Sequence, residues 1–416
     1  MTHTLYIKTW GCQMNVYDSA RIADLMAAHG YTLTSNPVDA SLIVLNTCHI
    51  RDKATEKVYS KLGRLNKIKR ARAKKGLSTL IAVGGCVGQA EGDEIVARAP
   101  YVDIVFGPQV YHRLPEMIRQ SKSGHVIDTD FPVESKFDHL PDEVASQGAA
   151  AYLAIQEGCD NFCTYCVVPY TRGPAWNRPA NDILDEARKW TDRGAREIIL
   201  LGQNVNTWKS DGQDGKDWRL GRLLFALAEA HPDLRLRYIT SHPSGMDDAD
   251  LPNAHAEIPG VMPFLHLPVQ SGSDSILKAM NRKHGRDHYL AIIDRFRSAR
   301  PDIAIGSDFI AGFPGETEKD FADTLDLVDR VGFAQGYSFK YSPRPGTPAA
   351  ALRYAVPEEI KTERLTRLQT ALWSHQLAFN KSCLGLEMDV LFERSGNRQG
   401  QVLGRSPYMQ SVYVKS

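Results

Sequence analysis

Two spacings of apolar residues alternate along most of the chain. Short apolar runs of strand length are followed by longer stretches in which apolar residues recur every three or four positions, as on one face of a helix. The run 41–48 (SLIVLNTC), for example, precedes a helical pattern from about Lys53 to Lys75. Strands that alternate with helices form parallel sheets, because each helix carries the chain back to the start of the next strand. The sequence therefore predicts an α/β protein.

The N-terminal region, residues 1–120, contains four such apolar runs. They are TLYIKTW (4–10), SLIVLNTC (41–48), TLIAVGGC (79–86) and VDIVFG (102–107). We expect a small parallel-sheet domain of the Rossmann or flavodoxin-like type here. Residues 121–148 are polar, contain two prolines and lack a helical period, so we expect a linker that crosses the surface.

Residues 149–376 resume the alternation and form the longest region. Their six apolar runs are 151–156, 196–202, 234–240, 262–269, 302–308 and 336–342. Six strands with helical crossovers predict a partial (β/α)6, TIM-like barrel. Residues 377–416 change character to three short β-like runs separated by turns, which predicts part of a small β-barrel.

Composition limits the choice of partners and compartment. The 416 residues carry a net charge of only +1, so contact with a nucleic acid would need local basic patches. No stretch approaches the ~20 apolar residues that cross a bilayer, and the N-terminus lacks the pattern of a signal peptide. We therefore expect a cytoplasmic protein with no membrane contact, in which cysteines serve as ligands, nucleophiles or core residues.

The strongest chemical signal is the spacing of Cys159, Cys163 and Cys166 directly after the first strand of the second region. A tetrahedral zinc site uses four protein ligands, and no fourth Cys or His lies nearby. A [4Fe-4S] cluster can be held by three cysteines, which leaves one iron open for another ligand. The alternative is a structural zinc site that takes its fourth ligand from a distant residue.

A second set of cysteines is dispersed along the N-terminal region. Cys12, Cys48 and Cys86 each end an apolar run. Consecutive parallel strands end at the same edge of a sheet, so the three thiols could converge there. The alternative is three buried core cysteines, because free cysteine is often buried. Cys383 stands alone near the end of a helical pattern, and we interpret it as a packed thiol.

Polar residues follow the predicted barrel strands, and we expect them to contact a cofactor or substrate. They are Gln203, Asn204, Ser241, Gln270, Ser307 and Asp308. The alternative for each is a role in a turn or helix cap, which favours the same residue types. Arg344 could bind a phosphate or carboxylate, although Pro345-Gly346 beside it is equally well explained as a rigid turn.

The stretch 61–75 is rich in Lys and Arg and contains no acidic residue. On a helix it would give a positive face that binds phosphates without reading base sequence. The alternative is a solvated charged helix. The candidate RNA contacts in this stretch are Lys61, Arg64, Lys67, Lys69, Arg70 and Arg72.

The Cys-x-x-x-Cys-x-x-Cys loop after a first barrel strand resembles that of the radical-SAM enzymes. The resemblance implies that Cys159, Cys163 and Cys166 hold a [4Fe-4S] cluster whose open iron binds S-adenosylmethionine (SAM) and yields a 5′-deoxyadenosyl radical. It also implies that Tyr165 lies near the adenine of SAM; simple packing beside the cluster is the alternative.

The three-cysteine N-terminal domain joined to this barrel resembles the methylthiotransferases. The resemblance runs over nearly the whole chain, in WGCQMNVYDS, NTCHIRDKA, GGCVGQ, YCVVPYTRG, LGQNVN, HLPVQSGSD, SDFIAGFPGET and YSPRPGTPA. It implies a methylthiotransferase N-terminal domain over 1–120, a radical SAM core over 149–376 and a partial RNA-binding barrel of the OB-like TRAM type over 377–416. His49 and Asn177 depart from the family pattern, and the terminal barrel is usually a few strands longer.

Within the family, GCQMN, YCVVPYTRG and LGQNVN most resemble the branch that modifies dimethylallyl-adenosine in tRNA. This implies that two SAM are used to add a methylthio group at carbon 2 of N(6)-dimethylallyladenosine beside the anticodon. A second [4Fe-4S] cluster on Cys12, Cys48 and Cys86 would present or donate sulfur. The implied partners are the anticodon stem-loop, an external electron donor and a sulfur source, and we expect a monomer.

Other functions fit the same motifs. The substrate could instead be threonylcarbamoyladenosine in tRNA or an aspartate of a ribosomal protein. The second cluster could relay electrons without giving up sulfur. Outside enzymes, the cysteines could hold zinc in an RNA-binding protein.

Overall fold

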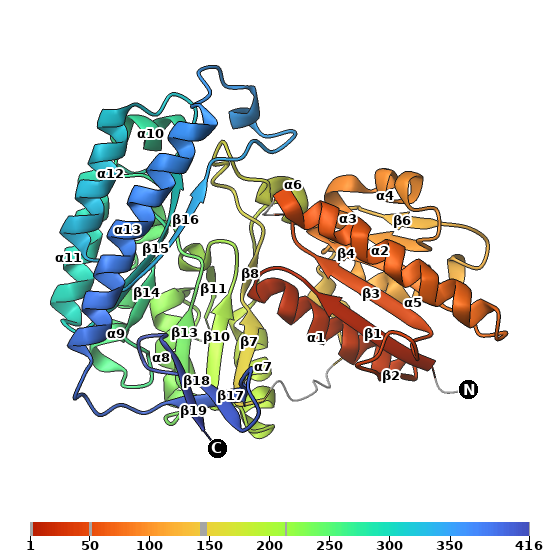
Figure 1. The fold of residues 1–416 in the computed structure, drawn as a ribbon. Coiled ribbons are helices and arrows are strands. Elements are labelled where there is room, and N and C mark those ends of the chain that lie inside the picture. The colour runs from red at the N-terminus through yellow and green to blue at the C-terminus, as the bar shows by residue number, and fades with distance from the viewer. Residues whose placement is uncertain (1–2, 50–51, 142–147, 213, 416) are drawn as a thin grey trace. The chain divides into compact units, whose positions relative to one another are not determined.

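The computed structural model describes residues 3–49, 52–141, 148–212 and 214–415. The chain divides into two compact units. The first comprises residues 1–145 together with Val167–Gly173, and the second comprises Ser146–Cys166 and Pro174–Ser416. A short segment that follows Cys166 in the sequence therefore belongs to the first unit. Figure 1 shows both units as α/β folds.

The first unit is built on a six-stranded sheet in the order β2-β1-β3-β4-β5-β6, and all of its pairs are parallel. Its strands are β1 (His3–Thr9), β2 (Tyr31–Leu33), β3 (Leu42–Thr47), β4 (Leu80–Gly85), β5 (Ile104–Phe106) and β6 (Val126–Asp128). This order is the flavodoxin-like one, in which the strand order reverses between β1 and β3. The predicted parallel sheet is confirmed, with two further strands at its edges.

Helices cover both faces of this sheet because each presents an apolar stripe to it. On one face, α1 (Gln13–Ala28) and α5 (Leu114–Gln120) pack Ile22, Met26 and Leu114 against the strands. On the other face, α2 (Asp52–Ala73) and α4 (Asp93–Arg98) pack Leu62, Leu65 and Ile95. The remaining helical segments are α3 (Cys86–Glu91), η1 (Tyr111–Arg113) and η2 (Lys136–His139). The sheet is thus sandwiched between two helical layers.

The predicted surface linker over 121–148 is partly wrong. Residues Val126–Asp128 form β6 and pair with β5 in the sheet. Lys136, in η2, is only 1% exposed. Residues 142–147 of the predicted linker lie outside the described part of the chain. A three-residue edge strand is too short to show an alternation of apolar and polar residues, which is why the pattern missed it.

The second unit contains the six parallel strands predicted for the barrel. They form two three-stranded sheets, β13-β10-β7 and β14-β15-β16. Their bounds are β7 (Ala150–Ala154), β10 (Glu197–Leu201), β13 (Arg235–Tyr238), β14 (Phe264–His266), β15 (Ala304–Ala311) and β16 (Gln335–Lys340). A parallel bridge between Leu236 and Val261 connects the two sheets. The partial six-stranded barrel is therefore confirmed.

Helices line the outer side of these strands; α11, α12 and α13 cover β14, β15 and β16 (Figure 1). The helices of this unit are α7 (Ala180–Asp192), α8 (Leu220–Ala230), α9 (Asp250–Glu257), α10 (Asp274–Ala279), α11 (Arg286–Ala299), α12 (Glu318–Val331) and α13 (Glu358–Ser382). Thr317 and Asp320 form a capping box at the start of α12, and Gly332 ends it in the left-handed conformation. No helix in the described part of the chain has both the length and the apolar character needed to cross a membrane.

Shorter elements complete the two units. Two small hairpins pair β8 (Gln156–Glu157) with β9 (Trp176–Asn177) and β11 (Lys209–Asp211) with β12 (Asp217–Arg219). The short helical segments are α6 (Val168–Arg172), which belongs to the first unit, and η3 (Val205–Thr207), η4 (Pro243–Gly245) and η5 (Pro348–Ala351).

The chain ends in an antiparallel sheet, as expected. Its strands are β17 (Leu391–Ser395), β18 (Gln401–Arg405) and β19 (Ser411–Lys415). The boundary expected between residues 376 and 377 falls inside α13, which continues to Ser382. Arg237 of β13 donates hydrogen bonds to the carbonyls of Ser406 and Pro407, which joins this sheet to the barrel strands.

Two candidate cysteine sites

The register of the first sheet brings the dispersed cysteines together. Thr9 of β1 is level with Asn46 of β3, and Asn46 is level with Gly84 of β4. Cys12 comes three residues after Thr9, and Cys48 and Cys86 come two residues after Asn46 and Gly84. Because adjacent strands lie about 4.8 Å apart, the three thiols share one short stretch of the sheet edge. This is the point where the strand order reverses, the usual ligand site of such folds.

Buried amides hold these strand ends in place. The Asn15 side chain donates to Asn46 Oδ1 and to the Thr47 carbonyl, both at 3.1 Å. Asn46 donates in return to the Asn15 carbonyl at 2.8 Å. Thr47 Oγ1 donates to the Gly84 carbonyl at 2.7 Å, which ties β3 to β4. The loops that carry Cys12, Cys48 and Cys86 are therefore fixed relative to one another.

Burial, neighbouring charges and hydrogen bonds shift the pKa values of thiols in this N-terminal cysteine site, which comprises Cys12, Cys48 and Cys86. A hydrogen bond with Cys48 lowers the pKa of Cys12 to about 6, against the effect of burial and with help from the charge of Arg172. Burial raises the pKa of Cys86, and the positive charge of Arg172 opposes this rise. A thiol that ionises readily beside a buried cation suits a metal ligand, since thiolates are the binding form.

The second cysteine site lies on the loop between β8 and α6. This loop is clamped by residues far away in the sequence: Thr164 N donates to the Met280 carbonyl at 3.0 Å. The Asn281 side chain donates to the carbonyl of Phe162 at 2.9 Å, and Phe162 has a positive φ of 48°. Cys163 is buried, and burial raises the pKa of Cys159 while the nearby Cys163 adds to the rise. The predicted loop site is thus a fixed turn with its thiols close together.

A buried arginine contacts this loop site. Arg282 Nη1 donates to Cys163 Sγ at 3.7 Å, and its Nη2 donates to the Pro268 carbonyl. The rings of His242 and His284 lie near it, edge to face at 5.6 Å between centroids. Burial, assisted by the Arg282 charge, lowers the pKa of His242 to about 2 and that of His284 to about 4. Both imidazoles are therefore neutral near pH 7. The sequence pattern identified none of these three residues.

Two of the predicted cofactor contacts are used inside the protein. The Gln203 side chain accepts a hydrogen bond from Gly158 N at 2.6 Å, which holds the start of the cysteine loop. Ser307 Oγ accepts from Val269 N and donates to the Leu267 carbonyl, both at 3.0 Å. Both side chains therefore fix neighbouring backbone, Gln203 at the start of the cysteine loop and Ser307 from within β15, while a contact of either with a cofactor stays a prediction.

Other predicted contacts keep unused polar groups. Asn204 Oδ1 and Ser241 Oγ are buried without a hydrogen-bond partner in the described part of the structure. Buried polar atoms are normally paired, so these two can receive a ligand. Asp308 lies 3.4 Å from His266 Nε2, and Gln270 adopts a positive φ of 75°.

Tyr165 packs against a cluster of apolar residues that includes Phe313 and Tyr341. Burial raises its pKa well above the usual value, and the charges of Cys163 and Cys166 contribute. The ring therefore lies beside the cysteine loop, as both interpretations of this residue require.

An aromatic face lies next to Asp308. Tyr337 and Phe339 alternate on β16, so they share one face of the strand, and they remain 52% and 42% exposed. The His266 ring meets the Tyr337 ring edge to face at 6.0 Å. Large exposed aromatics beside a polar group are suited to stacking on a planar ligand.

The predicted basic residues differ in their environments. Arg64, Lys67 and Arg70 of α2 are exposed. Lys61 is half-buried, and Lys69 Nζ forms an ion pair with Asp103 at 2.6 Å. Arg72 donates to Thr79 Oγ1 at 2.7 Å and to the Val38 carbonyl at 2.8 Å. Lys69 and Arg72 therefore stabilise the first unit itself, whereas the three exposed cations remain suited to phosphates.

Arg344 begins the tight turn that was the alternative interpretation of its motif. Thr347 N donates to the Arg344 carbonyl at 3.1 Å, and Gly346 between them has a φ of 80°. The Pro345-Gly346 pair thus has a structural role, while a contact between Arg344 and phosphate stays a prediction.

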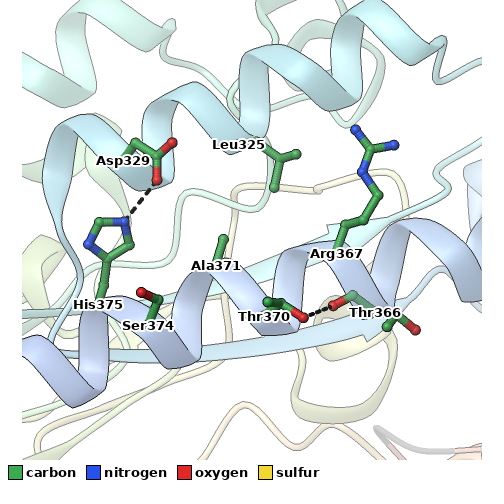
Figure 2. A pocket seen from close by; sticks show the side chains of 8 residues that line it. All are labelled: Leu325, Asp329, Thr366, Arg367, Thr370, Ala371, Ser374 and His375. Atoms are coloured by element: carbon green, nitrogen blue, oxygen red, sulfur yellow. Dashed lines mark hydrogen bonds and ion pairs between the residues drawn. The ribbon is translucent and has the colours of Figure 1, made fainter.

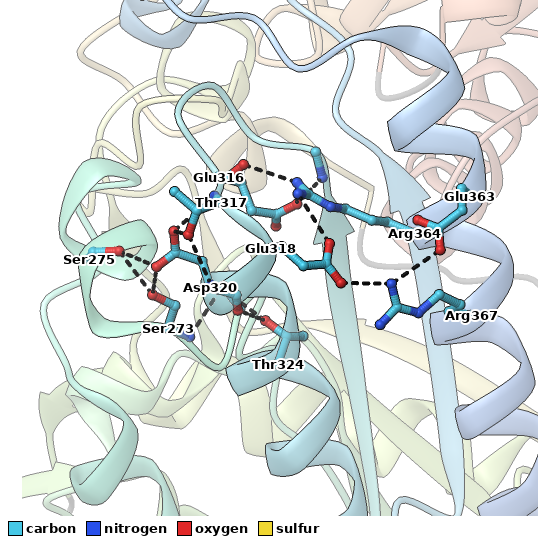
Figure 3. Close-up of polar contacts among 12 residues, drawn as sticks. Ser273, Ser275, Glu316, Thr317, Glu318, Asp320, Thr324, Glu363, Arg364 and Arg367 are labelled. Atoms are coloured by element: carbon cyan, nitrogen blue, oxygen red, sulfur yellow. Dashed lines mark hydrogen bonds and ion pairs between the residues drawn. The ribbon is translucent and has the colours of Figure 1, made fainter.

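A second network stabilises the loop after β15 (Figure 3). The buried Glu316 accepts from Gly312 N at 2.8 Å and from Arg364 Nη1 of α13 at 2.9 Å. Hydrogen bonds from Ser273, Ser275 and Thr317 lower the pKa of Asp320 against a burial effect that would raise it. These contacts fix the loop that carries Phe313, which packs in the same cluster as Tyr165.

The second unit also has a groove on its outer helical layer. It has a volume of about 550 Å³ and runs between α12 and α13 (Figure 2). Its lining includes an ion pair of 2.9 Å between His375 and Asp329. It opens on the outer helical layer and contains no cysteine, so it does not belong to the candidate chemistry.

The donor chemistry of both sites fits iron–sulfur clusters. All six of their cysteines are free of disulfides. Within the described ranges, no group of three or more His, Cys, Asp or Glu side chains is arranged to hold a single metal ion. In a four-iron cluster each thiolate binds a different iron, so the ligands stand further apart than around one ion.

Two family models match the chain. Residues 4–107 match the uncharacterized protein family UPF0004, and residues 153–328 match the radical SAM superfamily. The second match implies a [4Fe-4S] cluster and SAM as cofactors of the second unit.

Solved structures with similar folds are radical SAM enzymes of low sequence identity. The radical SAM methyltransferase TsrM from Kitasatospora setae, with cobalamin and a [4Fe-4S] cluster bound, is 12% identical with a TM-score of 0.61. The match covers 84% of this chain and 77% of TsrM. The cobalamin-dependent enzyme OxsB is 12% identical with a TM-score of 0.55, over 89% of this chain and 56% of OxsB. The chain therefore spans little more than half of OxsB, and these likenesses concern the fold.

Proposed function

Since the chain joins a UPF0004 domain to a radical SAM domain, a pairing that fits the radical-SAM methylthiotransferase family, we propose that it methylthiolates an adenosine of tRNA. The substrate we propose is N(6)-dimethylallyladenosine beside the anticodon, and the product is its 2-methylthio derivative.

One observation carries this proposal: two sets of three free thiols, one in each unit of a single chain. Cys12, Cys48 and Cys86 are gathered by sheet register, and the other set by a clamped loop. An enzyme that only makes a radical needs the loop set alone. The N-terminal set is the feature that adds sulfur chemistry, and we assign it a second [4Fe-4S] cluster that handles the incoming sulfur.

The choice of target follows from chemistry. Carbon 2 of adenine carries an unactivated hydrogen that no side-chain acid or base removes near neutral pH, so a radical is required. When bound, the cluster and SAM of the second unit supply that radical. The chain's own residues orient the reactants: Asn204 and Ser241 offer unpaired buried oxygens, and Arg282 steadies the thiol of Cys163.

Features of the second unit support a nucleobase as substrate. Tyr337 and Phe339 present exposed rings beside Asp308, which can accept hydrogen bonds from a base or ribose. Proteins recognise unpaired RNA bases largely by stacking them on such rings. An anticodon-loop nucleotide can leave its stack at low cost, which a paired base cannot. Exposed cations of α2 would add phosphate contacts.

The direct test is turnover by the anaerobically reconstituted full-length chain with SAM, a reductant and a sulfide source. The substrate is tRNA that already carries dimethylallyladenosine, and nucleosides are identified by mass spectrometry. We expect the 2-methylthio derivative of that nucleoside. A mass increase only on threonylcarbamoyladenosine tRNA, or only on ribosomal protein, would reassign the substrate. A colourless protein that binds zinc and cleaves no SAM would contradict the proposal that the chain is an enzyme.

A further inference from the structure

The short helix α6 carries the chain from the loop site into the first unit. It begins two residues after Cys166, yet it packs with residues 1–145. Gln109 donates to the carbonyl of Arg172 at 2.8 Å, which fixes the end of the helix. Gly173 then reverses the chain with a φ of 80°, and a side chain there would collide with the Phe131 ring. The backbone of Arg172 is therefore held firmly within the first unit.

The side chain of Arg172 is buried, with 3% exposure. Its Nη2 donates to Asp18 Oδ2 at 2.7 Å, and Asp18 is itself 1% exposed on α1. The other oxygen of Asp18 lies 3.3 Å from Lys136 Nζ. Asp18 is thus a fixed anchor that sets the direction of the guanidinium. Burying a charge in this way costs solvation, which the ion pair with Asp18 offsets only in part.

The helices around Arg172 lead to the N-terminal cysteine site. Its own helix α6 packs against α3, which begins at Cys86, and its partner Asp18 is on α1, which begins directly after Cys12. The positive charge of Arg172 lowers the pKa of both thiols, at Cys86 against a larger effect of burial. A planar guanidinium has several N–H groups in a rigid fork, so one Arg can hold a carboxylate and a sulfur at once. Lysine would present a single point of charge.

A purely structural ion pair is the simpler alternative, and the second unit provides an example. Arg237 donates to Glu197 at 2.8 Å, and both side chains are buried. Its remaining N–H groups bind backbone carbonyls, and no contact between Arg237 and a thiol is found among the described residues. Arg172 differs because its charge acts on two cysteines of a candidate metal site, and its helix packs against the one that begins at Cys86.

We propose that Arg172, anchored by Asp18, is a positioning residue of the N-terminal cysteine site that keeps a positive charge beside its cluster and so sets the cluster's reduction potential. This inference rests on the proposed function, because it takes a cluster to be bound by Cys12, Cys48 and Cys86. Hydrogen bonds to cluster sulfurs and nearby positive charge favour the reduced, more negative form and raise the potential. Arg172 is therefore the group through which the first unit tunes its cluster.

The test uses a full-length parent in which Cys159, Cys163 and Cys166 are replaced by Ala, so that only the N-terminal cluster is present. Iron per chain and the midpoint potential, from a redox titration followed by electron paramagnetic resonance, are measured after anaerobic reconstitution. We expect Arg172→Met to shift the potential to a more negative value. Arg172→Lys should shift it less, because the charge is kept while the fork is lost. Arg237→Met, the matched control, should leave the potential unchanged.

The outcomes separate this inference from the proposed function. A parent that binds no iron overturns the N-terminal cluster and the role of Arg172 with it. If the parent binds iron, and Arg172→Met and Arg172→Lys both leave its midpoint potential unchanged, only the role of Arg172 is overturned. If Arg172→Met fails to fold or to load iron, Arg172→Lys decides: a loaded cluster with a lowered potential supports the proposal, and an unchanged potential overturns it.

Discussion

The two cysteine sites are assembled in opposite ways. In the second unit, Cys159, Cys163 and Cys166 lie on one short loop, so the local chain already holds them close. In the first unit, Cys12, Cys48 and Cys86 come from three neighbouring strands, and they meet only once the sheet has formed. The loop site therefore depends on clamps to its backbone, whereas the sheet-edge site depends on strand register.

The sites also share a feature that neither spacing reveals. Each has a buried arginine: Arg282 donates to Cys163 Sγ, and the charge of Arg172 acts on Cys86 and Cys12. Both arginines are distant in sequence from these thiols, with Arg282 lying 119 residues from Cys163. Positive charge next to thiolates lowers the cost of placing several anionic sulfurs together. Although the two sites are assembled differently, each therefore has the positive charge of a buried arginine acting on its thiols.

The largest expected effect comes from removing the loop site. Replacing Cys159, Cys163 and Cys166 by Ala should reduce SAM cleavage to background, because the open iron that binds SAM is lost. The sheet-edge site lies in the other unit and should still bind iron, about four atoms per chain instead of about eight. Iron analysis and chromatography of 5′-deoxyadenosine measure both quantities. Loss of all iron would show that the two sites are not independent.

Removing the arginine of the loop site should have the next largest effect. We expect Arg282→Met to lower the rate of SAM cleavage by about 10–100-fold, as is typical when a residue that supports a metal ligand is lost. Arg237→Met in the same unit breaks a buried ion pair of similar depth and should cost about 3–5 kcal/mol of unfolding free energy. The rate of SAM cleavage per folded Arg237→Met molecule should match wild type. Equal rate losses in the two variants would mean that Arg282 acts only through stability.

Loosening the loop after β15 should have a smaller effect, restricted to the second unit. Glu316→Gln weakens the bonds to Gly312 N and Arg364, and we expect a loss of about 1–3 kcal/mol in the unfolding free energy measured with urea. Glu318→Gln is the matched control, since its side chain is 61% exposed and its ion pairs with Arg364 and Arg367 contribute about 0–1 kcal/mol. Equal losses in the two variants would contradict the role of Glu316 as a clamp.

The smallest effect concerns RNA binding by the first unit. Arg64→Ala with Lys67→Ala should weaken tRNA binding and reduce the dependence of log K on log salt by roughly 0.7–0.9 for each phosphate that the protein no longer neutralises. Lys69→Ala should instead lower stability, because Lys69 is paired with Asp103. Filter binding at several salt concentrations distinguishes the two. An unchanged salt dependence in the double variant would exclude α2 from RNA binding.

Most of the fold could be predicted from the sequence, whereas the two cysteine sets as cluster ligands stay a prediction. Apolar runs such as 41–48 and 302–308 are long and buried, so their pattern identified the central strands. The convergence of Cys12, Cys48 and Cys86 followed from one physical rule, that parallel neighbours end at the same edge. The pattern did not identify β2 and β6, because strands of three residues are too short to show one. It also placed a domain boundary at 376/377, which falls within the 25-residue helix α13.

Side-chain roles were less predictable than strand positions. Both Gln203 and Ser307 were expected just after strands. Gln203 does follow β10, but Ser307 lies within β15, and their bonds to Gly158 and Val269 fix neighbouring backbone. Arg172 lies in the YCVVPYTRG block, but the pattern predicted no role for it, because its partner Asp18 is distant in sequence. Residue type and spacing specify which groups can meet, whereas the partner that each group takes depends on the packed structure.

The division of work between the two sites is tested most directly by removing only the sheet-edge thiols. Cys12, Cys48 and Cys86 are replaced by Ala, and 5′-deoxyadenosine and methylthio-nucleoside are measured in the same reaction with dimethylallyl-modified tRNA. We predict that 5′-deoxyadenosine still forms while no methylthio product appears. Methylthio-nucleoside produced at the wild-type rate by this variant would contradict the assignment of sulfur transfer to the N-terminal cysteine site.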